Sequence, residues 1–151
     1  MEIERTHDWQ LIKEIVTHPS TWPHIGDDFA PRPEDWEPNR DEHARYLLAR
    51  ERDSVVAMLA LWPENHICWR AHVCVRPEFY GPKAVDAVKS ILRWVWDNTE
   101  CVRIVAHIPE YNTLAISFSV RCGLTGFGMN PKSHKKNGQL HNLILLGISK
   151  E

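Results

Sequence analysis

Short apolar runs typical of strands alternate along this chain with segments whose apolar residues recur at helical spacing. The pattern predicts a short strand over residues 2–5, then a helix that Asp8 caps and that ends near Thr17. Residues 46–50 and 55–62 are predicted to pair as a hairpin, because a polar turn sequence separates them. The second of these strands is apolar almost throughout, which indicates a strand covered on both faces.

A strand, a tight turn and a helix follow in the centre of the chain. The strand is predicted over residues 67–75 and stops before Pro77, because proline has no N–H and fixes φ. Gly81 supplies a turn that a Cβ would obstruct, and Pro82 stands where a helix begins. Free N–H groups and the positive end of the helix dipole make such a turn a phosphate site in outline, although many α/β turns look similar.

The last third of the chain repeats the alternation. A strand over residues 102–108 leads to a helix that Asn112 caps and Gly123 ends. Asn137-Gly138 is the dipeptide that a type I′ hairpin turn prefers, and an apolar strand follows it. This order predicts one α/β (α+β) domain over residues 1–151, with a mixed central β-sheet and helices on both faces.

Residues 19–40 break both periodicities. Five prolines alternate there with tryptophan, isoleucine and phenylalanine, so a long helix is excluded and the segment is too apolar for a solvated linker. We expect an ordered loop that folds over the domain and contains a short helical turn. Its aromatic residues either anchor the loop or line a site.

Two motifs carry a resemblance to a known family. Residues 75–81 read Val-Arg-Pro-Glu-Phe-Tyr-Gly, which is similar to the V-x-P-E-x-x-G motif of the GCN5-related N-acetyltransferase (GNAT) family. The later helix resembles the family's N-x-x-A-x-x-L-Y-x-K-x-G-F pattern through Asn112, Ala115, Phe118, Arg121, Gly123 and Leu124. The resemblance implies a GNAT-like acyl-CoA N-acyltransferase fold.

The resemblance also implies a site for acetyl-CoA as co-substrate. The strand end near Cys74 and Val75 is expected to pair with the pantetheine arm, and the later helix adds Asn112, Ala115 and Phe118. The turn expected to bind the pyrophosphate consists of Tyr80, Gly81, Pro82, Lys83, Ala84 and Val85. It departs from the family's Q/R-x-x-G-x-G/A pattern at Tyr80, Lys83 and Val85, and Pro82 removes one donor. Lys83 could compensate as a point charge on a phosphate.

The chain also matches only some of the catalytic residues that are typical of the family. Where the family often has a tyrosine that protonates the leaving thiolate, this chain has Ser119, whose hydroxyl is far less acidic than a phenol. Tyr111 or Tyr80 could approach from another direction. The expected general base is His72 on the fourth strand, with His107 on the fifth as the other candidate, because histidine titrates near neutral pH. Each histidine could instead be structural.

The amine acceptor is expected on the side built by residues 19–40. The resemblance places there Trp22, His24, Asp28 and Trp36, together with His107. The acceptor could be a small molecule or a peptide amine.

Composition limits the remaining classes. The chain has 151 residues and a net charge of −2, so no general attraction to nucleic acid or to an anionic membrane is expected. A basic stretch at residues 132–136 reads best as a solvated turn. The four cysteines lack CxxC spacing, which fits reduced thiols and a cytoplasmic location, and the His66–Cys74 strand gives no standard metal spacing.

Two hypotheses therefore stand. The first is an acetyl-CoA-dependent N-acetyltransferase that acts by direct attack within a ternary complex. The second is a GNAT fold retained without catalysis as a binding or structural module, such as a homodimer or larger assembly. Small GNAT-like proteins of phage genomes, some of which resemble virion or assembly components, illustrate that second class. The degenerate turn and Ser119 favour the second hypothesis, and the retained Asn112/Ala115 helix favours the first.

Overall fold

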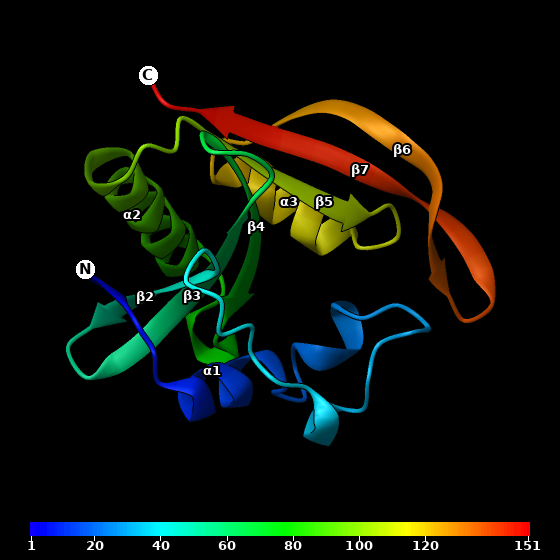
Figure 1. The fold of residues 1–151 in the computed structure, drawn as a ribbon, viewed down its shortest axis with the longest axis horizontal. Coiled ribbons are helices and arrows are strands. Elements are labelled where there is room, and N and C mark those ends of the chain that lie inside the picture. The colour runs from blue at the N-terminus through cyan, green and yellow to red at the C-terminus, as the bar shows by residue number, and fades with distance from the viewer.

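A seven-stranded mixed sheet runs through the computed structural model, which describes residues 1–151 (Figure 1). Every neighbouring pair of strands is antiparallel except β4 and β5, which run parallel. The strand order is β1-β2-β3-β4-β5-β7-β6. The strands are β1 (Glu2–Arg5), β2 (Arg45–Glu51), β3 (Ser54–Pro63), β4 (Cys68–Val75), β5 (Arg103–Pro109), β6 (Thr125–Lys136) and β7 (Gln139–Ser149). The predicted mixed sheet is confirmed.

Helices cover both faces of this sheet, as predicted. They are α1 (Trp9–Val16), α2 (Pro82–Asn98) and α3 (Thr113–Arg121). Leu47 and Ala49 of β2 belong to a core of 18 buried residues that also takes in α2, and the apolar side of α3 packs against it. Tyr46 and Leu48 of the same strand belong to a second core of 10 buried residues, which includes α1. This alternation follows from the two-residue period of a strand.

Local signals in the sequence set the ends of these elements. The Asp8 carboxylate accepts a hydrogen bond from Leu11 N at 3.1 Å, and the Asn112 side chain accepts one from Ala115 N at 3.2 Å. Gly123 ends α3 with φ of 103°. Asn137 and Gly138 both have positive φ, at 53° and 77°, as a type I′ turn requires. The predicted caps and hairpin turn are therefore confirmed.

The C-terminal hairpin is longer than the sequence indicated. The sequence predicted a solvated turn at residues 132–136, whereas β6 continues to Lys136. Register shifts after Gly126 and after Asn130 absorb the irregular residues, including Pro131. Such bulges allow a proline inside an edge strand because its ladder is already interrupted there. The basic residues expected at the hairpin tip consequently all lie within β6.

The segment between α1 and β2 is ordered, as expected. It contains two short 3₁₀ turns, Trp22–His24 and Pro33–Asp35. Trp22, Ile25 and Trp36 pack against the core on the α1 side. No helix of this chain has the length and apolar character needed to cross a membrane.

Candidate active site

The two parallel strands at the centre of the sheet separate part-way along their length. β4 and β5 pair only from Cys68 to Arg70 and from Arg103 to Val105. Beyond these residues the two strands no longer pair, which leaves residues 71–75 of β4 and 106–109 of β5 unpaired with each other. We call this separation the β4–β5 fork. It is an opening in the middle of a sheet, and it exposes backbone groups that a continuous ladder would use.

The free backbone groups of β4 belong to alternate residues. Arg76 N donates to Val56 O of β3 at 3.3 Å. Because hydrogen-bonded pairs alternate with non-bonded pairs along an antiparallel ladder, Cys74 also directs its N–H and C=O to β3. Val73 and Val75 therefore direct theirs into the fork. Of the two residues expected to meet an extended ligand, Val75 offers its backbone and Cys74 does not.

The end of β4 leads to the N-terminus of α2 through the expected turn. Gly81 has φ of 111° and ψ of −148°, a conformation that side chains with a Cβ rarely adopt. Val85 N bonds to Gly81 O at 3.2 Å, whereas the N–H groups of Gly81, Lys83 and Ala84 meet no acceptor within the protein. Three free donors thus gather at the positive end of a 17-residue helix. An anion is the natural ligand for them.

The side chains around this turn offer less to an anion than its backbone does. The Lys83 ammonium pairs with the Glu51 carboxylate at 2.9 Å, and both side chains are about half exposed. That contact lowers the pKa of Glu51, so the carboxylate stays ionised and competes with any phosphate for Lys83. Tyr80 is exposed, and the small Ala84 is buried against the sheet. The backbone rather than the side chains supplies the anion-binding character of the turn.

Two histidines stand on opposite strands of the fork. Continuing the register of Arg70 and Val105 by two residues places His72 opposite His107, on the same face of the sheet. The Nε2 atom of His72 is fully enclosed and has no hydrogen-bond partner. Burial lowers the pKa of His72, and burial followed by the charge of Arg70 lowers the pKa of His107. Both imidazoles are therefore neutral near pH 7 and can accept a proton.

One ion pair lies close enough to His107 to act on its pKa. Arg70 Nε is 2.6 Å from the Glu64 carboxylate, although the angles do not make this contact a hydrogen bond. The Glu64 charge opposes the fall in the pKa of His107. A carboxylate near an imidazole stabilises the imidazolium that forms when the ring takes a proton. His107 has such support, whereas the Nε2 atom of His72 is enclosed and no nearby charge offsets its desolvation.

Three of the four cysteine thiols are buried. Cys74 is buried on the α1 side, and burial raises the pKa of its thiol to about 12. Burial also raises the pKa of Cys101, and that of Cys122 to about 11. Because the thiolate is the reactive form, these residues are inert packing groups near neutral pH.

Tyr111 and two hairpin histidines form a second polar group beside the fork. The Tyr111 hydroxyl shares a 2.9 Å hydrogen bond with His134 Nε2. The Tyr111 ring also packs edge-on against the His141 ring, with 4.9 Å between the ring centroids. Burial, followed by Asp27 and Asp28, raises the pKa of Tyr111, so its phenol remains protonated. Ser119, by contrast, is buried on the inner side of α3. A phenol thus follows β5 in the loop before α3, and α3 itself supplies none.

The remaining helix residues have mainly structural contacts. The Asn112 side chain caps α3, and Ala115 and Phe118 pack against the large core. On the opposite side of the sheet, Trp22 and Trp36 also pack against a core, and His24 is exposed. Among the residues expected on the acceptor side, His107 alone stands on a strand of the fork.

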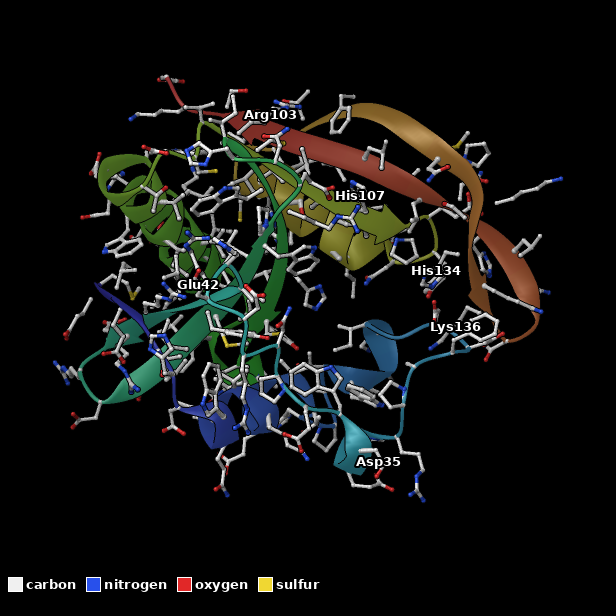
Figure 2. The ribbon with its side chains drawn as sticks, in the orientation of Figure 1. Asp35, Glu42, Arg103, His107, His134 and Lys136 are labelled. Atoms are coloured by element: carbon white, nitrogen blue, oxygen red, sulfur yellow. The ribbon has the colours of Figure 1, made fainter.

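Asp28 joins two segments that are distant in the sequence. Its carboxylate accepts hydrogen bonds from Asn137 N at 2.7 Å and from Gly138 N at 2.9 Å. Asp28 N donates to Lys135 O, and the Lys136 ammonium donates to Gly26 O. Figure 2 shows His134 and Lys136 on the side of the hairpin that faces this loop. We call these contacts the hairpin clamp. The sequence offered no sign of it, because its partners are separated by about a hundred residues.

This arrangement, with its central fork and its glycine turn, defines an acyl-CoA N-acyltransferase fold. A sequence model of the acetyltransferase (GNAT) family matches residues 7–124. The chain therefore belongs to the GNAT family, and the resemblance seen in its two motifs is confirmed.

Solved structures agree with the family. The fold matches a spermidine N-acetyltransferase from Vibrio cholerae, in complex with CoA and spermine, with a TM-score of 0.78. The two chains are 13% identical, over 99% of this chain and 95% of that one. A ribosomal-protein-alanine N-acetyltransferase from Brucella melitensis matches with a TM-score of 0.72 and 15% identity, over 99% of each chain. At these identities the likeness shows the fold alone. No curated protein matches the sequence.

Proposed function

We propose that this protein transfers the acetyl group of acetyl-CoA to a primary amine by direct attack within a ternary complex. The observation that carries the proposal is the β4–β5 fork, with two neutral histidines on its strands and free helix N–H groups beyond its open end. An extended thioester and an amine could meet there from opposite sides of the sheet. Relatives of similar fold include enzymes that acetylate spermidine and ribosomal protein alanine.

The residues present fit CoA in two places. The backbone of Val73 and Val75 offers an unpaired strand edge, which suits the two amides of a pantetheine arm. The N–H groups of Gly81, Lys83 and Ala84 suit the pyrophosphate. A Cβ built on Gly81 meets nothing within 4 Å, so space lies beside these donors.

The chemistry requires little beyond correct positioning. The amine nitrogen attacks the thioester carbonyl, a C–N bond forms, and the C–S bond breaks with its electron pair on sulfur. We assign the amine proton to His107, because partial access and Glu64 favour its charged form. His72, which the sequence favoured as the base, is proposed to line the acceptor. Tyr111, kept protonated by burial, is the available phenol for the departing sulfur.

The acceptor is proposed to be a slender amine. The hairpin clamp ties the hairpin to the loop over the face that carries His72 and His107, which restricts a bulky folded partner. Three carboxylates would attract a cation to this region. Asp27 lies near Tyr111, Glu64 near His107, and Glu110 near His141. Small alkyl amines and flexible peptide termini meet both conditions.

A second candidate is a GNAT fold kept as a binding or structural module. Lys83 is already paired with Glu51, and α3 has Ser119 where a phenol is usual. If this alternative is correct, the protein forms a homodimer or larger assembly whose stability does not change when CoA is added. It then transfers no acetyl group to any amine.

Calorimetric titration with acetyl-CoA tests the proposal. We expect a dissociation constant in the micromolar range, equivalent to about −8 kcal/mol. Lys83→Glu should weaken binding, because it places a carboxylate at the free N–H groups, whereas Lys89→Glu on an exposed part of α2 should not. A folded protein that shows no heat at millimolar acetyl-CoA would support the module instead, and its assembly mass would then be measured by light scattering.

A further inference from the structure

A pocket lies at the C-terminal end of α2. It is a cavity of about 410 Å³ between the last turn of α2 and the first residues of β2 and β4. A 17-residue helix is about 25 Å long, so this pocket is well separated from the glycine turn at the start of α2. We call it the basic pocket. Its lining includes Arg5, Arg45, His66, Trp69, Trp94 and Glu100.

Two guanidinium groups give the pocket its charge. Arg5 comes from the end of β1 and Arg45 from the start of β2, and neither forms an ion pair. Both arginines line the same pocket. Burial, followed by the positive charge of Arg5, lowers the pKa of Arg45, and the charge of Glu42 opposes part of that fall. Like charges placed together without a counter-ion are unfavourable, and an anion between them would relieve the repulsion.

The carboxylates nearby form no ion pair with either arginine. Glu100 is paired with His66. The side chain of Glu42 is 86% exposed and lies 3.5 Å from His43 Nε2, while its backbone carbonyl accepts a hydrogen bond from Arg5 at 2.7 Å. Figure 2 shows Glu42 on the segment that leads into β2. The Nε atom of Arg5 is enclosed without any acceptor, which leaves the guanidinium incompletely satisfied.

Tryptophans form the apolar part of the pocket. Arg45 stacks over Trp69, with its guanidinium carbon 4.2 Å from the ring centroid, so Trp69 holds the cation in place. Trp94, on the last turns of α2, is only partly buried and offers free surface. A pocket with two fixed cations and an aromatic wall suits an anionic head joined to a flat apolar body.

We propose that the basic pocket binds a small organic anion, with a carboxylate or phosphate between Arg5 and Arg45 and an aromatic body on Trp94. The alternative is that the two arginines only complement the negative end of α2, whose last turn has no basic residue of its own. In that case no ligand would bind. The proposal does not depend on acetyl transfer.

The 151-residue chain should be titrated with phenyl phosphate, benzoate and inorganic phosphate while the Trp94 indole N–H signal is followed by NMR. Because the phosphate probes can also occupy the glycine turn, the titration is repeated with Lys83→Glu, in which the Trp94 response should persist. We expect a saturable shift of the Trp94 signal with phenyl phosphate or benzoate. A response to phenyl phosphate alone assigns a phosphate head, and a response to benzoate assigns a carboxylate.

Two variants decide whether the arginines are responsible. Arg45→Gln should weaken binding about tenfold or more, equivalent to ~1.4 kcal/mol. Arg93→Gln removes the same charge from an exposed position on α2 and should leave binding unchanged. If Arg45→Gln fails to fold, Arg45→Lys keeps the charge and most of the stem but loses the planar fork, and it should also weaken binding. No saturable shift with any probe at about 10 mM, or equal effects of the Gln variants, would overturn the proposal.

Discussion

Replacing His107 by glutamine tests the proposed chemistry most directly. Glutamine keeps a polar side chain of similar size but cannot take a proton at neutral pH. His107 stands on β5 where the strands of the fork separate, and Glu64 and Arg70 lie close enough to act on its pKa. The variant should therefore keep its fold and its affinity for acetyl-CoA while losing the proton acceptor.

The expected loss follows from general base catalysis. Removing a positioned base lowers kcat/KM by about 10²–10⁴-fold, or ~3–5 kcal/mol of activation free energy. The pKa of His107 is lowered from its usual 6.5. The fraction of neutral His107 therefore rises as the pH increases through a value below 6.5. Over that range kcat/KM should rise with the neutral fraction, and this rise is the lower limb of the pH profile. In His107→Gln this lower limb should disappear.

The assay is the release of free thiol from acetyl-CoA with a small alkyl amine, measured across pH. His72→Gln is the matched control, because His72 faces the same fork from β4 and is also kept neutral by burial. That variant should reduce the rate less and keep the lower limb. An unchanged pH profile in His107→Gln would refute the assignment of His107, and loss of the limb in His72→Gln alone would move the role of base to His72.

Three further changes test the structural reasoning. Asn112→Ala should lower the free energy of unfolding by about 1 kcal/mol in urea denaturation, because α3 loses its cap, while Asn112→Asp should keep it. Ile91→Ala should cost about 2–5 kcal/mol in the same assay, since Ile91 is fully buried, whereas the exposed Leu114→Ala should cost less than about 0.5 kcal/mol. Asp28→Ala should remove the protection of the Asn137 and Gly138 amides in hydrogen exchange. Those hydrogen bonds lower the pKa of Asp28, so in the wild type their protection should hold at neutral pH and be lost as pH falls through that lowered value. Protection that survives in Asp28→Ala would mean that the hairpin turn does not need the clamp.

Features that depend on a few neighbouring residues could be predicted from the sequence. Asp8 and Asn112 cap helices because a short acceptor side chain reaches the N–H group three residues ahead. Gly81 and Gly138 mark turns because their backbones need positive φ. The order of these elements, together with the Val75–Gly81 motif, indicated the GNAT fold and the position of its anion-binding turn.

Features that join distant segments came from the tertiary structure. The fork exists because β4 and β5 part after three paired residues, and no local pattern in either strand shows where pairing ends. The neutral state of His72 and His107 depends on what covers them, and Asp28 reaches the hairpin through contacts about a hundred residues away. The sequence therefore determined which backbone conformations were possible and which residue types were available. The fold decided which side chains share an environment, because burial and charge depend on neighbours in space rather than along the chain.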